Sequence, residues 1–514
     1  SDSSVNELLD NVYRVRAFSD YNVSDYSNTF GFSFFDGNII FVDPEGSDFT
    51  GVGSMDYPYK TIQKGIDVAD EGDMIIASEG VYNEGINFSD KGITVSSYYG
   101  LDYDTTHISN TIISASPESW AVNINNNNAK LLGLTIKGGT NGGVVINNSP
   151  IIEYCTIRNN SGGVYDGNYY TGAGVWIGSE ANPTINYCTI KNNTLAGATG
   201  AQMGAGMYIS EYSHVTLNYC IIDSNRIYSV DYGQSGAGIY LESSSELTMN
   251  YSYLTDNSIQ INSAVGGIQG AGICEGAWGN NRIEINNSII DGNQLYGAYE
   301  HQGIAIYSTN SSEVIINNSQ INNNGINNID PEIQYHPPSV IFSEDADSLV
   351  IKNTNIRNNS DQIGVYAYGS TNMNFDNTLV EGSTIGFRIL GQSLPVFTNC
   401  TAILNDTYGF MVDNNAYFRN CIADSNNRGY LVGAGSTEMI NSLSINNSFG
   451  GVYTNNSSIL FRNTIISDNG NWGIYAQGSS SLTLVNSIIF FNGNSPIGGT
   501  DETTMSISYS DINA

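Results

Sequence analysis

The sequence predicts an all-β protein, a single right-handed parallel β-helix (a solenoid) with a short N-terminal capping helix. The first observation behind this prediction is a nine-residue phrase, Ile185 to Asn193, that recurs along the chain. The second is its spacing, about 21 to 23 residues in the C-terminal coils and about 31 to 36 in the middle. The third is that short β-branched segments alternate with Gly, Asn and Ser, which leaves no room for helices between them.

Each repeat consists of short strands in which alternate residues are apolar. Successive side chains of a strand point to opposite faces, so one face of each strand is apolar. A unit of this size cannot bury that face alone and must stack on copies of itself. Parallel stacking at ~4.8 Å per coil then gives a β-helix.

Asparagine recurs at the last position of the phrase. It tolerates the left-handed backbone of a tight corner, and its amide can hydrogen-bond to the next coil. We therefore predict a structural asparagine ladder along this corner. Its members in the middle of the chain are Asn160, Asn193, Asn225, Asn257 and Asn293.

The repeat also predicts how the chain is divided. Residues 1–37 do not repeat and are predicted to be an N-terminal extension, whereas residues 38–514 form the β-helix. Coils at about 140–338 carry extra residues at one corner, and coils at about 339–514 are short. Residues 61–69 have apolar side chains at helical spacing and are predicted to cover the N-terminal end of the core. The last unit shows no such cap, which favours self-association through the solenoid ends.

The charge balance excludes some classes of partner. The chain has 17 Lys+Arg against 50 Asp+Glu, a formal net charge of −33. Nucleic-acid binding needs clustered cations and is therefore excluded, and anionic membranes are disfavoured for the same reason. No apolar stretch reaches the ~18 residues that span a bilayer, so no membrane insertion is expected. Few lysines and many Asn, Ser, Thr and Tyr predict a secreted, extracellular protein of the cell surface, whose first residues we interpret as a mature start after signal removal.

Several motifs occur in series near the N-terminus. Phe41 to Asp48 leads through Pro58 to Gln63 and Gly72-Asp73 to Gly80-Val81-Tyr82-Asn83-Glu84. With the recurring phrase, this series resembles the bacterial pectin-lyase-like right-handed parallel β-helix repeat family, over roughly residues 39–513. The resemblance implies the fold. It does not select an activity, because that family includes polysaccharide lyases, glycoside hydrolases, epimerases, adhesins and surface proteins.

The extra residues of the middle coils all enter after the ladder asparagine, and we expect six stacked loops there to form a raised wall. Beside it, an outward aromatic column is predicted from Trp176, Tyr208 and Tyr240, with Tyr366, Tyr453 and Tyr475 at the same position further on. Aromatic faces stack on sugar rings, so wall and column are a candidate carbohydrate site; tyrosines that merely favour strands are the alternative. The candidate ligand-binding residues of the wall are Tyr165, Asp166, Tyr169, Tyr170, Tyr228, Asp231, Tyr232, Tyr299, Glu300 and His301.

The sequence marks no catalytic set. A lyase needs a basic residue near the substrate carboxylate, and the wall offers only Arg226. A hydrolase needs two carboxylates at a defined separation, and among the abundant acids, Glu275 included, no pair is marked by its spacing. No cofactor is certain; calcium is a candidate at Asp43, Glu45 and Asp48, although a turn explains these residues equally well.

Five of the six cysteines fall at one inward position of the phrase, which predicts an internal stack of free thiols. The sixth, Cys274, lies in the outward column and is expected to be exposed. The five inward cysteines are Cys155, Cys188, Cys220, Cys400 and Cys421.

Two classes of function follow from these patterns. The leading hypothesis is a non-catalytic extracellular structural or adhesive surface protein that assembles head-to-tail into a filament or sheath. The alternative is a carbohydrate-active enzyme, a lyase or glycoside hydrolase, that acts at the wall of the coils at about 160–338.

Overall fold

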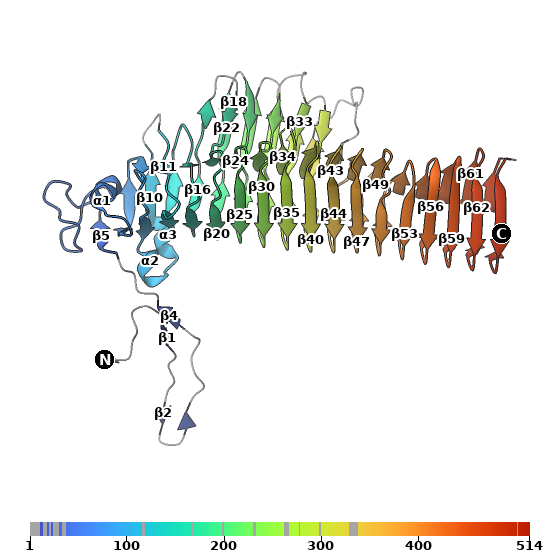
Figure 1. Cartoon of the computed structure of the whole chain (residues 1–514), viewed down its shortest axis with the longest axis horizontal. Helices are drawn as coiled ribbons and strands as arrows, with labels where there is room; N and C mark the ends of the chain where they lie inside the picture. The colour runs from blue at the N-terminus through green and yellow to red at the C-terminus, as the bar shows by residue number, and fades with distance from the viewer. Residues whose placement is uncertain are drawn as a thin grey trace.

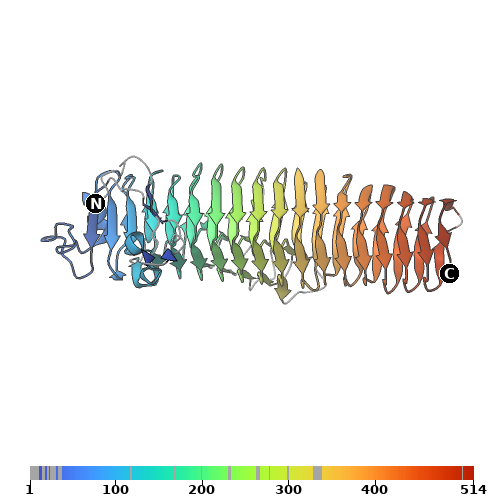
Figure 2. The same cartoon turned by 90° about the horizontal axis from the view of Figure 1, so that it is seen from below.

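The chain forms one right-handed parallel β-helix, which confirms the predicted fold class (Figures 1 and 2). Three parallel sheets run along it: sheet 1 from β5 (Ile39–Val42) to β65 (Thr504–Ser508), sheet 2 from β7 (Gly80–Tyr82) to β66 (Asp511–Ile512), and sheet 3 from β8 (Ile86–Asn87) to β64 (Ser495–Gly499). The computed structural model describes residues 37–115, 119–165, 169–197, 200–229, 233–261, 267–276, 278–297, 300–327, 338–500 and 502–513. Of residues 1–36 it describes only the backbone of four short strands, β1 (Asn11–Tyr13), β2 (Phe18–Ser19), β3 (Asn22–Val23) and β4 (Phe30–Phe32).

One coil illustrates how the sequence pattern becomes the core. β25 (His214–Asn218) lies in sheet 1, β26 (Ile221–Asp223) in sheet 2 and β29 (Ile239–Leu241) in sheet 3. Alternate residues point inward, and Leu217 and Ile222 are fully buried. Because each strand pairs in register with the next coil, apolar side chains of successive coils stack into continuous columns of the core.

The predicted asparagine ladder is confirmed, but the left-handed backbone expected at its asparagines falls on the residue before each of them, as at Asn192 (φ 53°) and Ser224 (φ 55°). Asn193 Nδ2 donates to Asn225 Oδ1 at 3.0 Å, and Asn225 Nδ2 donates to Asn257 Oδ1 at 3.0 Å. Each side chain also accepts from the backbone N–H of the preceding ladder residue and donates to a backbone carbonyl, as Asn225 Nδ2 does to Ile190 O. The ladder therefore satisfies buried polar groups at a corner where water has no access.

The predicted capping helix is α1 (Ile62–Val68). Thr61 caps its first turn by accepting from Lys64 N, and the Glu84 carboxylate accepts from the backbone N–H groups of Ile62 and Gln63. Ile62 and Ile66 are fully buried against the first coil, so the helix covers apolar core at this end. Among the described residues no helix is both long and apolar enough to cross a membrane.

The inserts of the middle coils are not irregular loops, as expected from the sequence, but two further sheets, which we call the wing (Figure 1). Their strands are parallel except for one antiparallel pair, Val164–Tyr165 with Tyr169–Thr171. Sheet 4 follows the ladder asparagine and sheet 5 precedes sheet 3. Leu195, Ile227, Ile259 and Leu295 share one register in sheet 4 and are fully buried, so the wing has a small core of its own. Sheet 4 contains β22 (Thr194–Gly197), β27 (Arg226–Ser229), β32 (Ser258–Ile261), β37 (Gln294–Tyr296) and β42 (Gly325–Asn327), and sheet 5 contains β17 (Val164–Tyr165), β18 (Tyr169–Thr171), β23 (Ala201–Met203), β28 (Gln234–Ser235), β33 (Gly267–Gln269) and β38 (Glu300–Gln302).

All six cysteines are free thiols and all are buried. The five predicted at the inward position do face the core, whereas the expectation that Cys274 is exposed was wrong. It is fully buried between Tyr240 and Tyr307 of neighbouring coils, and burial raises the pKa of its thiol.

We therefore expect no thiol of the native protein to react with an aromatic disulfide reagent at pH 8. After unfolding in guanidinium chloride, all six should react, because only exposed thiolates are nucleophilic. A rapidly reacting thiol in the native protein would contradict the burial of this set.

Candidate functional site

A groove runs along the concave corner between sheet 2 and sheet 4, where the wing leaves the solenoid. Its volume is about 470 Å³. Three consecutive coils contribute the same positions of β27, β32 and β37, so the lining positions, though not the side chains, repeat at one strand spacing, ~4.8 Å. The lining residues are Ser224, Arg226, Tyr228, Asp256, Ser258, Gln260, Gly292, Gln294 and Tyr296.

The groove carries one cation and one acid, so its lining has no net charge of its own. The Arg226 guanidinium donates to the Tyr228 hydroxyl at 3.4 Å. Burial, together with Asp223 and Asp291 of the neighbouring corner, raises the pKa of Asp256 above the usual value. A polyanion would therefore gain little electrostatic binding energy in this groove. The hydroxyl groups of a ligand could hydrogen-bond to several donors and acceptors of the lining.

The aromatic column beside the wing is buried, which corrects the expectation of an exposed stripe. Tyr208 is 6% and Tyr240 7% exposed, and their rings stack at 5.4 Å between centroids. They share a hydrophobic cluster that Trp176 and Met203 border; because Met203 belongs to β23 of the wing, the wing covers this face of sheet 3. Trp176, at the edge of the cluster, is only partly buried. Tyr208 and Tyr240 are thus packing residues and do not offer a free face to a ligand.

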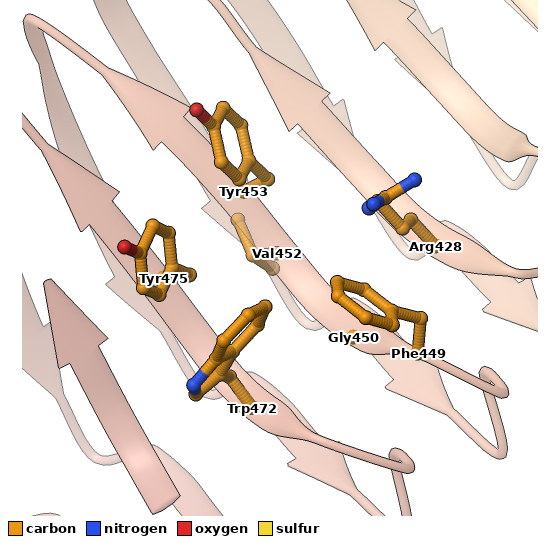
Figure 3. Close-up of a pocket in the computed structure, with 7 residues that line it drawn as sticks. All are labelled: Arg428, Phe449, Gly450, Val452, Tyr453, Trp472 and Tyr475. Atoms are coloured by element: carbon orange, nitrogen blue, oxygen red, sulfur yellow. The ribbon is translucent and has the colours of Figure 1, made fainter.

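The same column is open near the C-terminal end of the solenoid, where there is no wing strand, although Tyr366, in a coil that also has no wing strand, is still buried. Tyr453 of β58 (Gly450–Asn455) and Tyr475 of β61 (Trp472–Gln477) are in register and half-buried. Together with Arg428, Phe449 and Trp472 they surround a small pocket (Figure 3). The centroid of the Trp472 ring lies 4.4 Å from that of the Tyr475 ring and 5.0 Å from that of the Phe449 ring, which it meets nearly edge-on.

With both sites placed, comparison with known proteins identifies the family. A family model described as "Right handed beta helix region" matches residues 59–232, 166–332 and 278–443, which together span most of the chain. The chain belongs to this family. A search of curated proteins gave no match.

Solved structures with similar folds all have low identity to this β-helix protein. Pectate lyase Pel9A is 17% identical with a TM-score of 0.37, and the match covers 62% of this chain and 78% of that one. The periplasmic alginate epimerase AlgG is 11% identical with a TM-score of 0.34, covering 67% and 78%. Pectin methylesterase from carrot is 14% identical with a TM-score of 0.26, covering 61% and 83%. At these values the similarity concerns the fold alone.

The sequence-predicted wall residues are distributed unevenly over this β-helix. Tyr228 lies in the groove, and Tyr170 packs on the core of the wing. Asp166, Asp231, Tyr232 and Tyr299 lie outside the described residues, and Tyr165, Tyr169, Glu300 and His301 are described by their backbone alone, in β17, β18 and β38.

The groove also contains residues that the sequence analysis missed. Ser258, Gln260 and Gln294 follow the ladder asparagines in the same register as Arg226 and Tyr228. Asp256 instead precedes the ladder residue Asn257, as Ser224 precedes Asn225. Their equal spacing from the ladder asparagines is the sequence signal that could have placed these residues side by side. This spacing predicts neighbours only in paired strands, and the inserts were expected to be loops.

The calcium site predicted at Asp43, Glu45 and Asp48 is not assembled. Asp43 Oδ1 accepts from Glu45 N at 2.8 Å, and Asp48 Oδ1 accepts from Lys60 N at 2.8 Å. These carboxylates therefore fix a turn. Within the described ranges no group of three or more His, Cys, Asp or Glu side chains is placed to hold a metal ion.

Proposed function

We propose that this β-helix is an extracellular surface protein that binds a neutral polysaccharide along the groove between sheet 2 and the wing. The observation that carries the proposal is the repetition of the lining over three coils. A groove that presents the same positions again at each coil is suited to a ligand that repeats along its length. The tyrosines Tyr228 and Tyr296 offer ring faces to sugars, and the Ser and Gln side chains offer hydrogen-bond partners.

A rigid scaffold supports this role. The groove is formed on strands rather than on mobile loops, so its geometry changes little on binding. An adhesive function at a cell surface fits such a preformed site. The extracellular location and the head-to-tail assembly through the solenoid ends are predictions from the sequence.

The groove is tested by titrating the purified protein with neutral oligosaccharides selected on a glycan array. Tyr228→Ala and Tyr296→Ala should each weaken binding by about tenfold, because each removes a ring face from the groove. Tyr253→Ala is the matched control: Tyr253 is exposed on sheet 2 in the same coil as Asp256 and does not line the groove. Equal affinities of all three variants and the parent protein would refute the groove as the binding site.

A carbohydrate-active enzyme is the second candidate, favoured by one observation. Asp256 lines the groove with a raised pKa, which is the property of a general acid. An enzyme would release reducing ends from the bound polymer and lose this activity in Asp256→Asn. A binding protein would leave the polymer intact and retain affinity in that variant.

A further inference from the structure

A column of three cations lies on the outer face of sheet 2, near the N-terminal end of the solenoid (β16 in Figure 1). Its members are Lys137 of β13 (Thr135–Lys137), Arg158 of β16 (Thr156–Arg158) and Lys191 of β21 (Thr189–Lys191), from three consecutive coils. These strands pair in register, so the three positions lie directly above one another. All three side chains are partly exposed. The positive charges therefore follow one another at one strand spacing, ~4.8 Å.

The cation column has no acidic partner. Within the part of the chain that the structure describes, none of its three members forms an ion pair. Lys130, by contrast, pairs with Glu153 at 2.7 Å. The next residue of the column is Asp223, but its Oδ1 accepts from Thr255 Oγ1 at 2.9 Å. Like charges at neighbouring positions of a sheet destabilise the fold, so in a chain with 50 acidic residues this arrangement favours a binding site for anions over a structural ion-pair network.

Two further columns run beside the cations on the same side of the solenoid. Thr156 and Thr189 lie two residues before a cation of the column, so their side chains point to the same outer face. At the corner between sheet 1 and sheet 2, the rings of Tyr154 and Tyr187 stack at 4.7 Å between centroids, and Tyr187 is 47% exposed. Each of these two coils thus presents a tyrosine edge, a hydroxyl group and a cation in succession.

The spacing of the cations distinguishes between anions. A carboxylate has two oxygens in one plane and pairs best with a single guanidinium, and only one of the three cations is an arginine. A sulfate ester has three terminal oxygens and can therefore accept from the cations of two neighbouring coils. Three cations leave two such positions, which suits a ligand whose sulfates recur along its length.

The threonine and tyrosine columns suit the sugar rings of such a ligand, because threonine hydroxyls hydrogen-bond to sugar hydroxyls and aromatic rings pack against sugar carbons. We propose that this face of sheet 2 binds a sulfated polysaccharide. Its sulfate groups lie between Lys137, Arg158 and Lys191, and its sugar rings lie over the threonine column. The surface ends at Asp223, which is in register with Lys191 and repels a further sulfate. It is therefore separate from the groove.

Calorimetric titration of the full chain with dextran sulfate tests this proposal, with dextran as the uncharged polymer of the same backbone. We expect dextran sulfate to bind at least about tenfold more tightly than dextran, and its affinity to fall by roughly tenfold between about 50 mM and about 200 mM salt. Arg158→Gln and Lys191→Gln should each weaken binding by about tenfold. Lys352→Gln is the matched control, because Lys352 is a partly exposed cation of sheet 1 and lies outside the column.

Two further variants test whether charge is what the column contributes. Arg158→Lys keeps the positive charge and should retain most of the affinity for dextran sulfate. A loss as large as that of Arg158→Gln would contradict a role of the charge. Asp223→Asn removes the acid in register with Lys191 and should strengthen binding by about threefold, and weaker binding in this variant would contradict the boundary placed there.

The remaining outcomes separate this surface from the groove and sulfates from other anions. Tyr228→Ala should leave the affinity for dextran sulfate unchanged, so the two proposals fail separately. Equal affinities for dextran sulfate and dextran, or unchanged binding in both Arg158→Gln and Lys191→Gln, would overturn the cation column as the site. Tighter binding of polygalacturonate or of polyphosphate than of dextran sulfate would overturn the ligand class.

Discussion

Replacing Asn225 by alanine is expected to lower the free energy of unfolding by roughly 3–5 kcal/mol. The Asn225 side chain accepts from Asn193 N and Asn193 Nδ2 and donates to Ile190 O and Asn257 Oδ1, all at 3.0 Å and all buried. Alanine removes all four hydrogen bonds and leaves Asn193 N and Ile190 O without these partners in a site closed to water. Urea unfolding followed by circular dichroism measures the loss.

Asn218→Ala is the matched control in the same coil. Asn218 also belongs to a stack of asparagines, since its Nδ2 donates to Asn186 Oδ1 at 2.9 Å, but it lies half-buried on the outer face of sheet 1. Water can replace its partners, so we expect a loss below about 1 kcal/mol. Similar losses for Asn218→Ala and Asn225→Ala would contradict a special role of the buried ladder.

The second large effect is expected at Glu275, which the sequence analysis placed among the candidate catalytic acids. The structure instead puts it inside the solenoid, in register with the core residue Leu241 and 2% exposed. Its Oε2 accepts from the Ser308 hydroxyl and from Thr309 N, both at 3.2 Å. Burial nevertheless dominates and raises the pKa of Glu275 to about 7, from an ordinary 4.5.

This shift gives the pH dependence a definite sign. Below pH 4.5 the carboxyl group is protonated in both the folded and the unfolded state, so its ionisation does not lower the free energy of unfolding. Between pH 4.5 and pH 7 only the unfolded state ionises, so the folded state loses stability as the pH rises. Above pH 7 the loss is complete and amounts to about 3 kcal/mol.

Glu275→Gln should remove this loss while keeping the shape of the side chain. We expect the variant and the parent protein to have similar unfolding midpoints at pH 4.5. The variant should be more stable by about 3 kcal/mol at pH 8. Urea unfolding at several pH values gives the difference directly. A stability difference that does not change with pH would show that Glu275 does not titrate on folding.

The sequence contained enough to predict the solenoid and its ladder, because both follow from residues that repeat in register. It also contained the signal for the wing: Leu195, Ile227, Ile259 and Leu295 each lie two residues after a ladder asparagine. Alternation over only three or four residues is too short to distinguish a strand from a loop, and the strands became recognisable only once their stacking was known.

Other features could not be predicted from local patterns. Tyr208 and Tyr453 occupy the same position of their repeats, yet Tyr208 is buried beside the wing and Tyr453 is half-buried in a coil without a wing strand. Cys274 belongs to the same buried cluster as Tyr208. The pocket depends on Arg428 of one coil and on Phe449 and Gly450 of the next, which meet only through the pairing register. Whether a side chain is buried by segments far away in the sequence depends on tertiary structure and not on residue type.

Because the groove is formed on the wing, its length depends on the number of coils that line it. Each of the three coils that line the groove adds one strand spacing, ~4.8 Å, to its length, without changing the three main sheets. The length of the groove therefore changes in steps of one whole repeat. Gain or loss of one lining coil would change the length of polymer that the groove can hold. It would also change the chemistry of the groove, because equivalent positions carry different side chains, such as Arg226, Ser258 and Gln294.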